Sequence, residues 1–476
     1  MKLLPFLCVF CGLLLPAAAA WPLASALCRP GRTGVLPWLA AFPLGYGLLT
    51  AGLFLANLLC GVRMGVGAGL VVLACVCAVG LWARGRSLSH VAGNLRTGLM
   101  RSEGRVFNPR VERLLACALL GMAAMLWISR GVLALSGPVG VDDIPGMGVW
   151  GYKALAIADS GQIPWSLLCD RERPYLNPSY PLGYPLLLAW GHWFAGGVDD
   201  HAVKLLPCLS GLLVFLMLAV MLCESGFPLW IALVLGLAPC CGDVFGYCLE
   251  ALYAETTLLL FLLPGVWLVQ RNLRERAAPD LWLGVLLLGM AAWVKQEGMF
   301  FLVLVLSWLV VDGWRRRNGR GLAGASAAAA ALFVMPWAWC RWKTGVSLSD
   351  FSLIQPWKAG IHETLCVLGM GWRKGLCGMF LALKENGGLW VVAAALLAGG
   401  LARSPRQGNG IGFAWYAALV PPAFFMSLYV FSVRELEWHM DASLPRLLLV
   451  SGMCALALGA GAFAPDDAAA SPGGRW

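Results

Sequence analysis

Two adjacent carboxylates, Asp142 and Asp143, follow a long apolar run in the stretch 140–156, which reads GVDDIPGMGVWGYKALA. Turn-forming residues precede and follow the pair, which predicts a bent connection and not a helix. A carboxylate at the edge of a low-dielectric cavity can act as a general base, because loss of solvent raises its pKa toward the working pH. The alternative is a solvated loop acid that caps the next helix, and residue spacing alone favours that alternative.

Other ionisable residues lie at the ends of apolar runs. Glu255 begins a run in EALYAETTL, where an acid would equally suit the first turn of a helix. Lys295 and Glu297 occupy the short break between two runs in WVKQEGMFF. An ionised group at bilayer depth costs roughly 2.5–3.5 kcal/mol, so Lys295 is expected to pair with an acid or an anionic ligand. A plain Lys–Glu turn between two helices is the alternative.

A proline and an arginine lead into the last apolar run, in VRELEWHMDASLPRLLLV. Pro445 suits the first turn of a helix and would leave Arg446 at the outer end of that run. Arg446 could hold a phosphate at the membrane surface, or it could extend its head group toward water. His439 belongs to the same segment, where an ordinary interfacial histidine is the alternative.

The composition shows what kind of chain must position these residues. Of 476 residues, 60% are hydrophobic and 13% are charged, whereas soluble domains are about half apolar and a quarter charged. The sequence therefore predicts an all-α polytopic membrane protein. Its excess of 35 Lys+Arg over 25 Asp+Glu lies in short loops between apolar runs. That distribution is typical of the positive-inside rule and argues against a nucleic-acid partner.

Thirteen apolar runs are long enough, or nearly long enough, to cross a membrane, which takes about 20 residues. They are residues 3–27, 36–60, 64–83, 113–136, 203–223, 228–247, 256–270, 281–295, 299–312, 321–340, 389–402, 411–432 and 446–463. Basic residues concentrate around 84–113, 271–276, 314–320 and 403–406, which we assign to the cytoplasm. Alternation then places 137–202, 248–255, 295–298, 341–388 and 433–445 outside. It also predicts an outer N-terminus and an inner C-terminus.

Two segments bear on this count of spans. Residues 181–194, PLGYPLLLAWGHWF, would reverse every later loop if they crossed the membrane. We therefore predict a helix that lies at the outer interface or dips into it, which suits its tryptophans. The N-terminal stretch MKLLPFLCVFCGLLLPAAAAWP resembles a signal peptide, but the parity of the loops favours a retained first helix.

The chain divides into three parts by these criteria. Residues 1–112 hold N-terminal transmembrane helices and a basic cytoplasmic loop. Residues 113–463 hold the main transmembrane domain, with outer loops at 137–202 and 341–388, and residues 464–476 form a short cytoplasmic tail. From about Val149 the first outer loop is predicted to form an amphipathic helix that ends at Gly161.

Across residues 113–450 the chain resembles the GT-C superfamily of polytopic glycosyltransferases, which includes protein O-mannosyltransferases and lipid A aminoarabinose transferases. The resemblance rests on the order of several segments, none decisive by itself. They are VDDIPGMGVWGYKA, NPSYPLGYPLLLAWGHWFAGG, HAVKLLPCLSGLL, LYAETTLLL, AAWVKQEGMFFLVL and LEWHMDASLPRLLL.

The resemblance implies a GT-C-like fold, a sugar donor carried on polyprenyl phosphate, and an active site on the outer face of the inner (plasma) membrane. An acid of the first outer loop would be the catalytic base, a role that falls on Asp143 or Asp142. The implied acceptor is a glycan, a lipid or a protein. The residues expected to bind the substrate and the lipid phosphate are Glu255, Lys295, Glu297, His439, Arg446, Lys153 and Tyr184.

The sequence is also compatible with two other functions. A multispan transporter or a flippase for lipid-linked sugars would use the same intramembrane charges, but it should show repeated halves, and none is visible. A structural partner of another envelope enzyme is a third possibility. No certain cofactor is implied: a divalent metal could bind near Asp142, Asp143 and Glu255, but no ligand spacing demands one.

Overall fold

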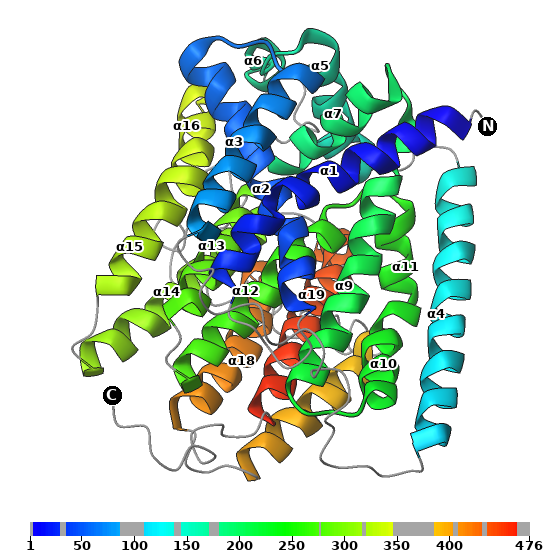
Figure 1. Cartoon of the computed structure of the whole chain (residues 1–476), viewed down its shortest axis with the longest axis vertical. Coiled ribbons are helices and arrows are strands. Elements are labelled where there is room, and N and C mark those ends of the chain that lie inside the picture. Colours follow the sequence, from blue (N-terminus) through cyan, green and yellow to red (C-terminus); the bar gives the residue numbers. More distant parts are fainter. Residues whose placement is uncertain are drawn as a thin grey trace.

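The computed structural model describes residues 3–28, 35–85, 109–137, 144–170, 180–275, 278–316, 320–345, 385–402, 408–430 and 436–463. Over these residues the secondary structure is helical, and none of them lies in a strand. Figure 1 shows the helices gathered in one bundle, with α4 along one side and α5, α6 and α7 together at one end. The protein is an all-α polytopic membrane protein, as its composition predicts.

The first four predicted runs are helices. They are α1 (Leu3–Leu27), α2 (Leu36–Cys60), α3 (Val66–Gly85) and α4 (Pro109–Ser136). The N-terminal helix α1 packs into the bundle: Val9, Leu13 and Ala20 are buried, and the Gly12 carbonyl accepts a hydrogen bond from the Trp190 indole. The residues that resemble a signal peptide are thus part of the folded bundle.

Short helices join α4 to the rest of the bundle. They are η2 (Ile144–Gly151), α5 (Tyr152–Ser160), α6 (Trp165–Leu168), α7 (Gly183–Ala195) and α8 (Asp200–Val203). The predicted amphipathic helix is present and ends at Gly161, whose positive φ of 64° caps it. The chain is helical from Ile144, earlier than the predicted helix start near Val149, and the bent connection predicted at Asp142 and Asp143 lies outside the described residues.

The remaining predicted runs are also helical. They are α9 (Leu205–Glu224), α10 (Leu229–Leu237) with η4 (Ala238–Cys241) and α11 (Asp243–Glu250), α12 (Glu255–Glu275), α13 (Ala278–Val294), α14 (Gln296–Arg316), α15 (Arg320–Ala329) with η5 (Ala330–Val334) and α16 (Met335–Thr344), Glu385–Ala402, α18 (Gly408–Val430) and α19 (Leu436–Ala462). The last helix differs from its prediction. Pro445 lies inside α19 and not in its first turn, because the helix begins at Leu436.

Among the described residues, ten helices are long and apolar enough to cross a membrane. Leu229–Cys241 and Asp243–Glu250 pass the same test as a pair bent by 70°, and Ala278–Val294 and Gly410–Phe425 are apolar but shorter. In its described residues each predicted run is thus mainly helical, although Gly242 interrupts the run 228–247. The number of thirteen crossings stays a prediction, as does the face of the membrane on which each end lies.

Different contacts between helices and loops lie at the two ends of the bundle. At one end, which we call the loop end, residues 144–170 and 180–204 meet the turns of other helices. The Met64 amide donates to the Gly161 carbonyl, the Cys169 thiol to the Lys343 carbonyl, and the Lys204 ammonium to the Gly137 carbonyl. At the opposite end Gln270 donates to Leu458, and Arg271 pairs with Asp280. The described residues of the predicted outer segments that make these contacts, in 144–170, 180–202 and 341–345, therefore lie at one end of the bundle.

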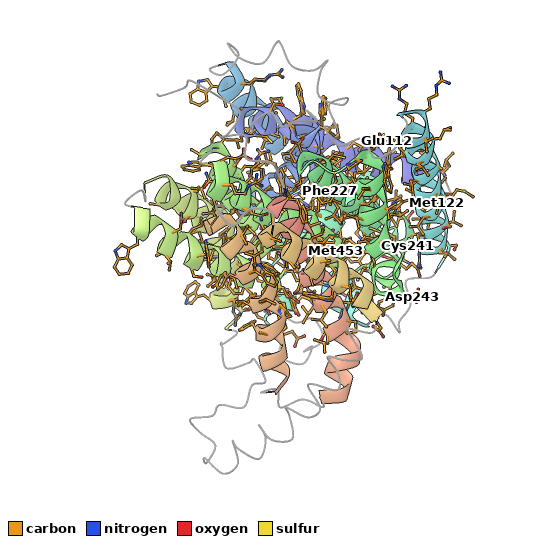
Figure 2. The ribbon with its side chains drawn as sticks, turned by 90° about the horizontal axis from the view of Figure 1, so that it is seen from below. Glu112, Met122, Phe227, Cys241, Asp243 and Met453 are labelled. Atoms are coloured by element: carbon orange, nitrogen blue, oxygen red, sulfur yellow. The ribbon has the colours of Figure 1, made fainter. Side chains whose placement is uncertain are left out.

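The helices differ strongly in how far they are buried. All residues from Glu255 to Leu273 of α12 are buried, and Gly265 and Gly284 let α12 and α13 approach closely. Helix α4 is mostly exposed, as expected for a helix that faces lipid. Figure 2 shows Met122 of α4 on the rim of the bundle and Met453 of α19 in its middle.

Helix α7 is more deeply enclosed than an interfacial helix would be. Its residues from Gly183 to His192 are all buried, between helices that include α1, α2, α5 and α13. A Cβ atom on Gly183 would lie 2.5 Å from the carbonyl oxygen of Trp293, so the start of α7 packs directly on the end of α13. The segment 181–194 is therefore an interior helix, and its first turn is held beside Lys295.

Candidate functional site

Four ionisable side chains meet at the loop end and form one ion network. The Glu255 Oε1 atom accepts from Lys295 Nζ at 2.9 Å and from an Arg446 guanidinium nitrogen at 2.7 Å. Lys295 Nζ also lies 2.9 Å from Glu297 Oε1. The residues come from the start of α12, the α13–α14 junction, the first turn of α14, and α19. The prediction that Lys295 pairs with an acid is confirmed.

Local backbone features explain why these side chains converge. Glu255 is the first residue of α12, where the helix dipole favours an acid. Lys295 separates α13 from α14, and the Gly298 amide donates back to the Lys295 carbonyl to close a tight turn. A side chain at Gly298 would overlap the backbone of Ala291. The side-chain amide of Asn386 donates a hydrogen bond to the carbonyl oxygen of Pro445, which lies in α19 next to Arg446.

The network is much more enclosed than the Arg130–Glu250 ion pair at the loop end. Its four side chains are between 1% and 15% exposed. Arg130 of α4 and Glu250 of α11 also pair, at 3.0 Å, but they are 21% and 35% exposed. An enclosed ion pair is costly to form from solvated charges and costly to break, whereas an exposed pair contributes little. The network is therefore the unusual feature of this end.

Aromatic side chains surround the network. The Arg446 guanidinium stacks 4.1 Å above the Tyr253 ring, which also contacts Tyr247. Burial raises the pKa of Tyr180 to about 12, and the nearby carboxylate of Glu297 acts in the same direction. Tyr180 and Tyr253 were not among the predicted site residues. The one sequence signal for Tyr180 is its place in the segment NPSYPLGYP, rich in proline and tyrosine.

Lys153 and Tyr184, two predicted site residues, contact Trp150, which in turn contacts Tyr180 beside the network. Trp150 contacts Tyr180 and Tyr184 edge to face, with ring centroids 5.0 and 5.5 Å apart. The Lys153 ammonium lies 5.9 Å from the centre of the Trp150 ring. Tyr180 thus connects the helices η2 and α5 of the loop segment to the ion network.

The described part of the structure does not include the predicted catalytic pair. Asp142 and Asp143 lie outside the described residues, which resume at Ile144. His439 belongs to α19, but its side chain is likewise outside the described part. The structure therefore brings together Glu255, Lys295, Glu297 and Arg446, with Lys153 and Tyr184 nearby, and leaves the identity of the base untested.

The metal site considered near Asp142, Asp143 and Glu255 is not tested, because both aspartates lie outside the described residues. Among those residues no group of three or more His, Cys, Asp or Glu side chains could hold a metal ion. Glu255 and Glu297 are instead engaged by cations of the protein itself. The chemistry available at the network is therefore ionic and hydrogen-bonding: two cations can meet an anionic group, and two carboxylates can accept hydrogen bonds.

Buried Lys153 gives a testable effect of pH on stability. Burial lowers the pKa of Lys153 to about 7, a shift that the neighbouring Cys340 partly opposes, whereas an unfolded lysine has a pKa of about 10.4. The unfolded chain therefore binds more protons between pH 7 and 10, and stability rises with pH across that window. We expect Lys153→Met to raise the melting temperature in detergent by about 5 °C at pH 6. The gain should shrink toward pH 10.

The control for this prediction is Lys343→Met, which removes an exposed lysine at the end of α16. Its melting temperature should follow that of the wild type at every pH. A gain for Lys153→Met that does not change with pH, or no gain at pH 6, would contradict the assignment of a destabilising buried ammonium.

The bundle and the network together define the class of protein: a polytopic helical membrane protein with a buried ion network at its loop end. Comparisons with known proteins take the identification no further. No protein-family model matches the chain, and no curated protein and no solved structure matches it. The resemblance to GT-C glycosyltransferases therefore rests on the sequence segments alone.

Proposed function

We propose that the protein is a glycosyltransferase that moves a sugar from a polyprenyl-phosphate donor to an acceptor on the outer face of the plasma membrane. The observation that carries the proposal is the enclosed network of Glu255, Lys295, Glu297 and Arg446. Two cations at the end of an apolar bundle suit a phosphate attached to a long lipid tail. Carboxylates beside them suit the hydroxyl groups of a sugar.

In the proposed reaction, the acceptor hydroxyl oxygen attacks the anomeric carbon of the donor sugar from the side opposite the phosphate. The bond between that carbon and the phosphate oxygen breaks, and polyprenyl phosphate leaves. Asp143 or Asp142 takes the proton of the acceptor hydroxyl. Lys295 and Arg446 stabilise the negative charge that grows on the leaving phosphate.

Arg446 provides the direct test of this proposal. We expect purified protein in nanodiscs to bind decaprenyl-phosphoryl sugars, and Arg446→Met to weaken that binding about tenfold or more, because a charge-assisted contact to phosphate is lost. Arg446→Lys, which keeps the charge, should recover part of the affinity. The matched control is Arg130→Met, which removes the cation of the more exposed pair at the same end. Equal binding by wild type and Arg446→Met would count against the proposal.

A transporter or flippase for lipid-linked sugars is the second candidate, and one observation favours it. Helices α10 and α11 form a pair bent by 70° within an apolar stretch, and broken helices are common in transporters. Reconstituted vesicles separate the two functions. A glycosyltransferase releases polyprenyl phosphate from the labelled donor when an acceptor is present, whereas a flippase moves the intact donor between leaflets.

A further inference from the structure

Within the described part of the chain, two carboxylate oxygens of the network have no hydrogen-bond donor. Glu255 Oε1 accepts from Lys295 and Arg446, but Glu255 Oε2 has no partner among the described residues. Glu297 Oε2 also has no hydrogen-bond partner among the described residues, whereas Glu297 Oε1 lies 2.9 Å from Lys295 Nζ. Both oxygens are buried. An unpaired buried acceptor costs about 1–3 kcal/mol, so each of these oxygens favours a ligand that donates hydrogen bonds.

The charges of the network cancel. Glu255 and Glu297 carry two negative charges, and Lys295 and Arg446 carry two positive charges. Among the described residues, the other titratable groups that face Glu255 and Glu297 are Tyr180, Cys248 and Tyr253, none of which adds a positive charge. The proposed base, Asp143 or Asp142, would add a negative charge beside the network. A monoanionic guest therefore leaves one uncompensated charge in a poorly solvated place, and a dianionic guest leaves two.

These two features separate the substrate and the product of the proposed reaction. A polyprenyl-phosphoryl sugar is a phosphodiester with one negative charge, and its sugar hydroxyls are donors. Polyprenyl phosphate has lost the sugar. It is a phosphomonoester that carries nearly two negative charges at pH 7, since its second pKa is about 6. The transfer step itself thus produces a molecule that fits the network less well than its precursor.

We propose, on the basis of the glycosyltransferase function above, that Glu255 and Glu297 make the site selective for a hydroxylated lipid phosphodiester over the lipid phosphomonoester. Their unpaired oxygens accept hydrogen bonds from the donor sugar, and their charges oppose the second negative charge of the product. Glu255 and Glu297 are thereby specificity-determining residues that promote release of the spent carrier.

Three lipids with one tail test the proposal: decaprenyl phosphate, decaprenyl methyl phosphate and decaprenyl-phosphoryl glucose. The methyl diester has a single charge and no hydroxyl, so it separates the effect of charge from that of hydrogen bonding. At pH 8 we expect the wild type in nanodiscs to bind the methyl diester about tenfold more tightly than the phosphomonoester, a difference of about 1.4 kcal/mol. The glucosyl diester should bind more tightly than the methyl diester.

Glu297→Gln removes one negative charge and keeps the shape of the side chain. It should tighten binding of decaprenyl phosphate about tenfold and reduce the preference for the methyl diester. The matched control is Glu250→Gln, which changes the same type of residue in the Arg130 pair and should leave all three affinities unchanged. A further measurement uses the wild type alone. When the pH is lowered from 8 to 5.5, the phosphomonoester takes up a proton and loses most of its second negative charge. Its affinity for the protein should therefore rise toward that of the methyl diester.

The outcomes are distinguishable. If the wild type binds the phosphomonoester as tightly as the two diesters at pH 8, or if its affinity is unchanged at pH 5.5, the selectivity is refuted and the glycosyltransferase function stands. An unaltered lipid preference in a folded Glu297→Gln variant likewise refutes the role of Glu297. Binding of none of the three lipids by the wild type overturns the selectivity together with the proposed function.

Discussion

Replacing Asp143 by asparagine is expected to lower the rate of sugar transfer roughly 100-fold or more, the range for the loss of a general base. Asparagine keeps the size and the polarity of the side chain but cannot take a proton at neutral pH. Insertion, folding and lipid binding should therefore be normal. The measurement is release of polyprenyl phosphate from a labelled donor by purified variants in nanodiscs, with size-exclusion chromatography to confirm folding.

Asp142→Asn should be made beside it, because the sequence leaves open which of the two adjacent acids is the base. The matched control is Asp159→Asn, which changes an exposed acid of α5 in the same loop segment. We expect one of the first two variants to be inactive and the control to be active. If both Asp143→Asn and Asp142→Asn transfer sugar at the wild-type rate, the proposed mechanism is wrong.

Much of the fold can be predicted from this sequence, because the apolar runs are long and their breaks are clear. The runs 3–27 and 36–60 coincide with α1 and α2 to the residue. Errors arise where tertiary contacts overrule local preference. Pro445 was expected to begin a helix, but α19 continues through it, and residues 144–148 are helical despite two glycines and a proline.

The candidate site, like the fold, could be predicted from the sequence only in part. A lysine between two apolar runs must find a counter-charge, and this cost alone predicts that Lys295 pairs with an acid. The partners of Lys295 could not be predicted, because Glu255 belongs to a different helix. Nor could the contact of Glu255 with Arg446, which lies 191 residues after Glu255 in the chain. The sequence does not single out Tyr180, because an aromatic residue among prolines also suits a membrane interface. Its place beside the network depends on the packing of α7 against α13.

Removal of Glu255 should destabilise the protein more than removal of any other carboxylate at the loop end. Lys295 and Arg446 would then keep their charges in an enclosed place without the oxygen that both of them contact. Breaking a buried ion pair by deleting one partner costs about 3–5 kcal/mol. We expect Glu255→Met to lower the melting temperature in detergent by several degrees and to reduce the yield of monodisperse protein.

Glu250→Met is the matched comparison, because Glu250 pairs with Arg130 at nearly the same distance but with more solvent access. A pair of that kind contributes about 1 kcal/mol at most. The double variant Glu255→Met/Lys295→Met then tests the network itself. Since it removes a buried charge of each sign, it should be more stable than the sum of the two single losses implies. Additive losses, or a loss for Glu255→Met no larger than for Glu250→Met, would show that the four side chains do not act as one network.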